Sequence, residues 1–226
     1  MNSQIGLFGK LPAHGDFVER NLVRSFTTPW DDWLQRGLAS SREIIGASWL
    51  DFYLTSPVWR FFLSNGCLDS GAWAGALLPS VDSVGRYFPL TFAIPVTESS
   101  NPHLFLMKNS SWYEALEDIA IASLQQSFDA DDTLLQLKNI SSQAEFGTEQ
   151  ATTNTANGWI FTANDNELSS NYAHLLQQLQ NSTTSSSPES QSLWWNRASP
   201  NRNSALINCR GLPNAQQFSF MLSGKW

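Results

Sequence analysis

Two short polar segments hold side chains that could form a reactive centre. His14 and Asp16 stand two residues apart, and Ser80 and Asp82 repeat this spacing further along the chain. One imidazole and two carboxylates could hold a metal ion, whereas Ser80, His14 and Asp82 supply the three groups of a serine hydrolase. Neither a GxSxG elbow nor a diagnostic metal-ligand spacing accompanies them. A small metal-dependent hydrolase around His14, Asp16 and Asp82 therefore remains an alternative to a loop stabilised by local hydrogen bonds.

Two other patterns lack the spacing that their chemistry requires. Gly6-Leu-Phe-Gly-Lys10 is too short for a GxxxxGK[ST] phosphate loop and has no hydroxyl after the lysine. Cys67 and Cys209 stand far apart with no CxxC partner, so they offer neither a zinc framework nor a disulfide scaffold. We expect buried, reduced thiols, no metal and no cofactor.

The segment from Leu78 to Leu90 is the most unusual stretch, because polar residues interrupt two strand-like runs. Asp82, Arg86 and Tyr87 surround Gly85 in this connection. They could brace the turn through an Asp82–Arg86 pair, or they could form a recognition surface, since exposed arginine beside aromatic residues is typical of binding hot spots. The sequence leaves both interpretations open.

The charge balance restricts the partners. The chain has 13 Lys and Arg against 20 Asp and Glu, and residues 109–191 hold only one of these cations against 11 of the acids. An acidic middle repels nucleic acid and anionic lipid, so a protein partner with a basic face fits better, unless the acidity only keeps the protein dispersed. No 18-residue apolar run and no basic leader are present, which predicts a cytoplasmic protein without a membrane span.

Apolar periodicity predicts helices around a sheet. Thr28 followed by Pro29 predicts a helix start, with an apolar stripe that includes Trp30 and Trp33 in the core. Further helices are expected over residues 47–54, over 112–122 and from Asn164 to Leu179.

Short apolar runs bounded by turn residues predict strands. Residues 57–63, 72–78 and 88–96 should form a meander, and the expected remaining strands lie at residues 4–8, 158–161, 192–195 and 204–208 of the same sheet. Polar residues near 141–157 and 181–192 predict mobile loops. The expected fold is α/β of the α+β type: one domain over residues 1–226, with a central mixed, largely antiparallel sheet flanked by helices in layers.

Several long motifs resemble one family. They are FGKLPAHGDFVERNL (8–22), TTPWDDWLQRGLA (27–39), SWLDFYLTSPVWRF (48–61), AWAGALLPSVDSVGRYFPLT (72–91), SLWW (192–195), GLP (211–213) and FSFMLSGKW (218–226). In this order they resemble the TagF family of type VI secretion system-associated proteins. The resemblance implies a cytosolic bacterial repressor without catalytic activity, which acts after translation by binding a forkhead-associated-domain scaffold. The length corresponds to the form without a phosphatase domain. A structural accessory subunit of the secretion machine is a further alternative.

The resemblance also selects candidate site residues. These are polar positions within otherwise apolar family motifs, together with two aromatic neighbours: Lys10, Asp16, Arg20, Arg60, Ser80, Asp82 and Arg86, with Trp59 and Tyr87. We expect their loops to converge at one end of the sheet and to form a docking surface for a protein partner.

Overall fold

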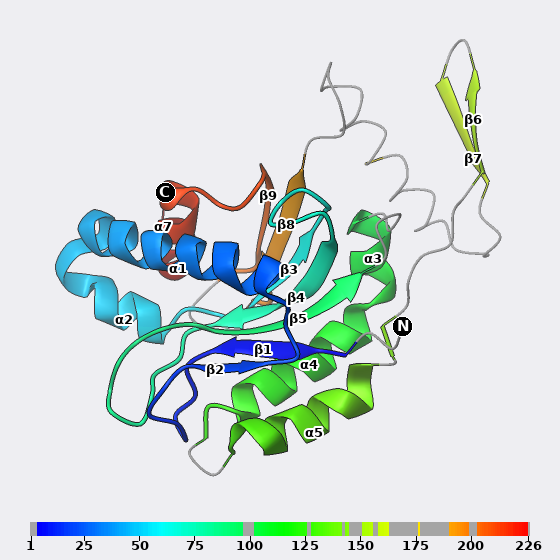
Figure 1. Ribbon diagram of the computed structural model, residues 1–226. Helices are drawn as coiled ribbons and strands as arrows, with labels where there is room; N and C mark the ends of the chain where they lie inside the picture. Colours follow the sequence, from blue (N-terminus) through cyan, green and yellow to red (C-terminus); the bar gives the residue numbers. More distant parts are fainter. Residues whose placement is uncertain are drawn as a thin grey trace.

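A seven-stranded antiparallel sheet forms the centre of the protein (Figure 1). The computed structural model describes residues 4–96, 102–125, 128–141, 143–144, 151–155, 158–162, 176, 190–198 and 203–225. The strand order is β2-β1-β5-β4-β3-β8-β9. The strands are β1 (Gly6–Gly9), β2 (Val18–Arg20), β3 (Trp59–Leu63), β4 (Ala72–Leu78), β5 (Leu90–Val96), β8 (Gln191–Asn196) and β9 (Ala205–Arg210). The expected meander over residues 57–96 is confirmed, because β3 pairs with β4 and β4 pairs with β5.

Helices cover both faces of this sheet. One layer contains α1 (Arg24–Ile45), a 3-10 turn (Gly46–Ser48), α2 (Trp49–Leu54) and α7 (Ala215–Ser223). The opposite layer contains α3 (Pro102–Lys108), α4 (Ser110–Ala122) and α5 (Ala130–Ser141). The predicted fold class, helices in layers around a largely antiparallel sheet, is confirmed (Figure 1).

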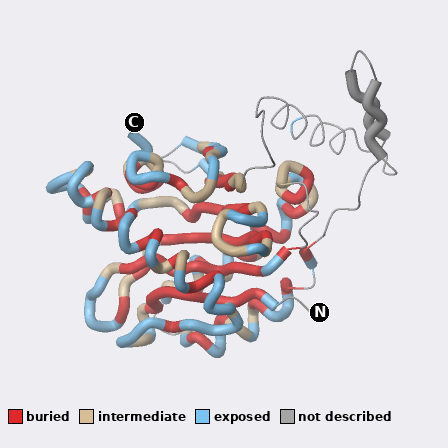
Figure 2. The backbone as a smooth tube through the Cα atoms, turned by 45° about the horizontal axis from the view of Figure 1, so that its top comes forward, coloured by how far each residue is buried: buried red, intermediate tan, exposed pale blue. Residues whose placement is uncertain are grey.

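The central strands are buried on both faces, as Figure 2 shows. Since successive side chains of a strand point to opposite faces, Phe61 packs in the core beneath α1 and Phe62 packs in the core beneath α4. Trp30 is fully buried in the first core, where its ring stacks on Trp194 with centroids 5.9 Å apart. Its indole N–H donates to Thr91 Oγ1 at 2.8 Å, so the buried donor is satisfied.

The first helix begins earlier than its sequence signals predict. Thr28 is not the N-cap; α1 starts at Arg24, after Val23, and Pro29 lies inside the helix. The additional turn buries Phe26, which stacks on Trp30 at 5.2 Å and contacts Trp73 at 4.5 Å. Burial of this ring outweighs the preference of proline for the first helical position.

A second, two-stranded sheet forms where we expected one sheet only. β6 (Ala151–Thr155) pairs with β7 (Gly158–Thr162), so the strand expected at residues 158–161 does not join the main sheet. β6 also lies within the loop expected near 141–157; its threonines have the branched side chains that favour strands. The helix expected from Asn164 to Leu179 falls outside the described residues except for Leu176, as does most of the loop near 181–192. Among the helices that the structure describes, none has the length and apolar character needed to cross a bilayer.

Candidate functional site

A buried carboxylate organises the connection between β4 and β5. Asp82 is only 3% exposed, and its carboxylate forms salt bridges with Lys10 Nζ and with Arg86 Nε, the latter at 2.7 Å. Its Oδ1 atom accepts the backbone N–H groups of Val84 at 3.1 Å and Arg86 at 2.8 Å. Burial opposes the charge on this carboxylate, but the hydrogen bonds from Lys10, Arg86 and Val84 outweigh it and hold the pKa of Asp82 well below its ordinary value. The Asp82–Arg86 pair therefore braces the turn.

The same contacts join this connection to the loop after β1. Arg86 donates to the carbonyl of Gly15 and lies 3.6 Å from the fully exposed carboxylate of Asp16. Ser80 Oγ donates to the Lys10 carbonyl at 2.6 Å. The two loops thus form one braced unit, which we call the paired loops (residues 10–17 and 79–88).

His14 connects the paired loops to the layer of α4 and α5. Its Nε2 atom accepts the backbone N–H of Ala130, the first residue of α5, at 3.1 Å. Ser80 donates to a backbone carbonyl instead of to this imidazole, so the hydrogen-bonded relay of a serine hydrolase is not formed here. Within the described ranges, no group of three or more His, Cys, Asp or Glu side chains is arranged to hold a metal ion.

Tyr53, from the layer of α1 and α2, supports the paired loops. Tyr53, on α2, is fully buried; its hydroxyl donates to the Ser80 carbonyl at 2.8 Å and accepts the Ser80 N–H at 3.0 Å. Burial raises the pKa of Tyr53 well above its ordinary value, so the hydroxyl stays protonated. Tyr87 packs edge-on against Tyr53 with ring centroids 5.8 Å apart.

A further ion pair lies between β3 and α4. Arg60 Nε donates to Glu117 Oε2 at 2.9 Å, and the Arg60 side chain is only 5% exposed. Trp59 points to the opposite face of the sheet, where its Nε1 donates to the Met221 carbonyl at 2.9 Å. Arg20 lies at the exposed end of β2 and donates to the carbonyl of Glu19.

The structure therefore brings together only part of the expected site. Six of the nine residues belong to the paired loops: Lys10, Asp16, Ser80, Asp82, Arg86 and Tyr87. Arg60, Trp59 and Arg20 lie elsewhere, because strand alternation separates Arg60 from Trp59 and β2 carries Arg20 to the sheet edge. Five of the nine are buried: Lys10, Ser80, Asp82, Arg60 and Trp59.

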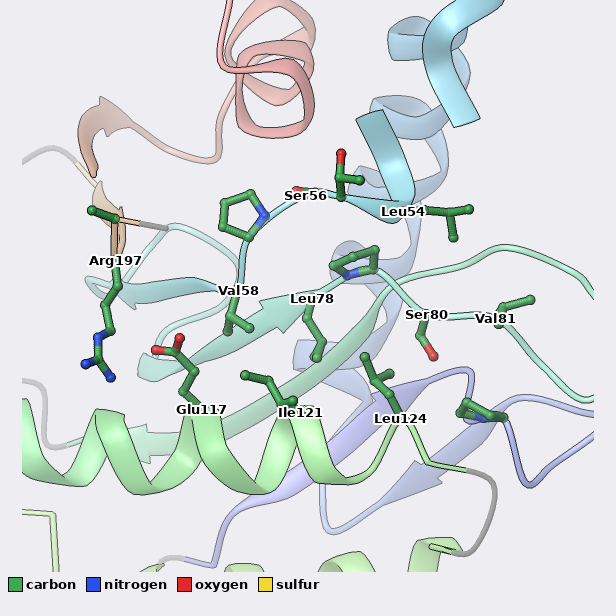
Figure 3. Close-up of a pocket in the computed structure, with 15 residues that line it drawn as sticks. Leu54, Ser56, Val58, Leu78, Ser80, Val81, Glu117, Ile121, Leu124 and Arg197 are labelled. Atoms are coloured by element: carbon green, nitrogen blue, oxygen red, sulfur yellow. The ribbon is translucent and has the colours of Figure 1, made fainter. Parts of the chain in front are cut away.

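A groove runs between the paired loops and the Arg60–Glu117 pair. It encloses about 580 Å³ between residues 54–58, the end of β4 and α4. Figure 3 shows Val58 and Leu78 pointing towards α4, while Ile121 from α4 and Leu124 from the turn after it point back into the same space. Ser80 and Val81 of the paired loops line one end of the groove, and Glu117 and Arg197 line the other.

Sequence reasoning missed this groove. Its walls come from segments far apart in the chain, and neither Ile121 nor Glu117 was among the candidate site residues. One available signal was the position of Ile121, an apolar residue outside the helical stripe, which proves to be 51% exposed.

Comparison with known proteins places the chain in a family. Residues 6–140 match the family model described as the TagF N-terminal domain, type VI secretion system-associated. The chain belongs to the TagF family. This TagF chain is also similar to a crystal structure of PA0076 from Pseudomonas aeruginosa PAO1, at 31% identity and a TM-score of 0.76, over 98% of this chain and 95% of that one. No curated protein matches it.

The residues that match the family model include most of the candidate site of this TagF chain. The matched residues include both paired loops, the Arg60–Glu117 pair and the α4 wall of the groove. Arg197 comes from the chain after β8, outside the matched residues. The groove of this TagF chain thus combines the matched domain with a side chain from its C-terminal part.

Proposed function

We propose that this TagF chain is a cytoplasmic, non-enzymatic repressor of the bacterial type VI secretion system, which acts after translation by binding a forkhead-associated-domain scaffold protein. The observation that carries the proposal is the match of residues 6–140 to a family described as type VI secretion system-associated. Repression and the identity of the scaffold follow from the resemblance of the motifs, and they are what the experiments below test.

The state of the polar side chains supports a binding role. Asp82, Lys10 and Ser80 are buried and occupied by hydrogen bonds within the paired loops, so they give the loops a fixed shape. Around them, large apolar side chains remain accessible: Phe17 is 50% exposed and Val84 is 66% exposed. A rigid base with exposed apolar and charged groups is typical of a protein-binding surface.

Two measurements test the proposal. Isothermal titration calorimetry of the purified chain with the purified scaffold should show saturable binding. Deletion of the gene for this chain should raise secretion of a type VI effector, and expression of the wild-type chain should restore the lower level. Absence of scaffold binding, or unchanged secretion after deletion, would contradict the proposal.

The same experiments separate the alternatives. A structural accessory subunit would make deletion abolish secretion instead of raising it. For a small hydrolase, a folded His14→Ala variant would bind the scaffold and fail to repress. For a stoichiometric repressor, repression depends on binding to the scaffold. A folded His14→Ala variant should therefore keep both scaffold binding and repression or lose both.

A further inference from the structure

We propose that the groove between residues 54–58, the end of β4 and α4 binds an amphipathic segment of the scaffold, whose apolar side chains enter the groove while an acidic side chain pairs with Arg197. This inference rests on the proposed function, because it assigns the surface with which the scaffold is bound. It is carried by the shape, the apolar rims and the charge of the groove.

The groove has apolar walls and exposed apolar rims. Val58 and Leu78 form part of its floor, and both are buried. Leu54 on one side is 52% exposed and Ile121 on the other is 51% exposed. A volume of about 580 Å³ is large enough for several apolar side chains of a partner. Half-exposed apolar side chains on both rims favour a protein segment that covers them over a ligand that enters only the hollow.

Several polar groups of the groove already have partners inside the protein. Ser80 Oγ donates to the Lys10 carbonyl, and Ser56 Oγ donates to the Met221 carbonyl at 3.2 Å. Glu117 accepts the Arg60 guanidinium. These groups are engaged in holding the walls, so the groove offers a partner mainly apolar contact.

Arg197 supplies the charge that selects the partner. The side chain is exposed at the end of the groove near Glu117, as Figure 3 shows. Among the described residues, no carboxylate forms an ion pair with it. Glu117 is paired with Arg60, so of the two charged residues that line the groove only Arg197 is left without an ion-pair partner among the described residues. An acidic side chain of the partner complements that charge.

Four variants of the full chain test the groove against matched positions. Ile121→Glu places a charge in the groove, whereas Ile44→Glu makes the same change at an isoleucine of similar exposure, 55%, on α1. Arg197→Glu reverses the charge beside the groove, and Arg36→Glu reverses that of an exposed arginine on α1. All four positions are exposed, and thermal unfolding should verify that each variant folds as the wild type does.

Calorimetry with the purified scaffold gives the readout. We expect Ile121→Glu and Arg197→Glu to weaken binding by about tenfold or more, because each removes an interaction from the centre or edge of the interface, while the two α1 variants stay within about twofold. Equal affinity of all variants, or equal loss in both pairs, would overturn the groove while leaving the proposed function intact. Loss in Ile121→Glu without loss in Arg197→Glu would overturn the acidic contact. No binding by the wild-type chain would overturn the proposed function and this inference together.

Discussion

The Tyr53 hydroxyl and the backbone of Ser80 exchange two hydrogen bonds, at 2.8 Å to the carbonyl and 3.0 Å from the N–H. Through this exchange, one side chain of α2 satisfies both backbone groups of a buried residue at the start of the paired loops. The position of these loops thus depends on a residue from a distant helix.

Tyr53→Phe should therefore destabilise the protein. Removal of the hydroxyl leaves a buried N–H and a buried carbonyl without their partner, which costs about 1–3 kcal/mol of the free energy of unfolding. Urea denaturation measures this loss. Tyr87→Phe is the control, because the Tyr87 hydroxyl forms no hydrogen bond with the described residues, and its ring contact with Tyr53 is preserved. Equal effects of both variants would contradict the role assigned to the exchange.

Glu117→Gln should destabilise the protein by leaving Arg60 buried without a carboxylate. Removing one partner of a buried ion pair typically costs about 3–5 kcal/mol, and partial exposure of Glu117 favours the lower end of that range. The double variant Arg60→Met with Glu117→Met should recover most of the loss, since apolar side chains then fill the site. Chemical denaturation of the three variants measures both effects. A loss below about 1 kcal/mol in Glu117→Gln would show that the pair behaves like a surface pair.

Stability should fall in acid because Asp82 must bind a proton. Its pKa in the folded protein lies below the value of about 3.9 for an unfolded chain, so its contribution is complete above pH 4 and decreases as the pH falls further. Urea denaturation between pH 7 and pH 2.5 should show this decrease. Asp82→Asn should lower stability at pH 7 and flatten the acid decrease.

Asp16→Asn provides the control for Asp82, since its side chain is fully exposed and lies 3.6 Å from Arg86. An exposed pair at this distance contributes little, so the acid decrease should remain. An unchanged acid profile in Asp82→Asn would show that other carboxylates govern it.

The Cys67 thiol should react slowly with alkylating reagents. Burial raises its pKa to about 11, and the thiol donates to the Gln191 carbonyl at 3.1 Å. Since the thiolate is the nucleophile, the rate at pH 8 should be at least about a hundredfold below that of the unfolded chain and should rise with pH. Mass spectrometry after iodoacetamide treatment, with and without urea, measures the two rates. Native and unfolded rates within about tenfold of each other would contradict the prediction.

The local parts of the fold could be predicted from the sequence. The strands β3, β4 and β5 follow from short apolar runs bounded by turn residues, such as Asn65-Gly66 and Ser70-Gly71 between β3 and β4. Their neighbours in sequence are also their neighbours in the sheet. The pairing of β6 with β7 was missed although the two strands are neighbours in sequence, because the polar residues of Ala151–Thr155 were expected to form a loop. The start of α1 was missed for a different reason: Phe26 extends the helix by burial against Trp73, which no local signal reveals.

The local part of the candidate site could likewise be predicted from the sequence. Polar residues that interrupt apolar sequence identified the paired loops, because such residues must find partners when buried. Strand alternation alone shows that Trp59 and Arg60 point to opposite faces, so they cannot form one surface. The groove could not be predicted from the sequence, because Arg197 and Ile121 line the same groove only in the tertiary fold.

The position of β8 beside β3 has a consequence for synthesis on the ribosome. When the nascent chain has emerged only as far as α5, β3 has β4 on one side and lacks its later partner on the other. That unpaired edge of Trp59–Leu63 is apolar, and unpaired apolar edges promote aggregation. At this stage of synthesis, the core beneath α1 also lacks Trp194 and Phe218. A truncated chain ending at residue 140 should therefore aggregate, and we expect the smallest unit able to fold to be larger than the matched residues 6–140.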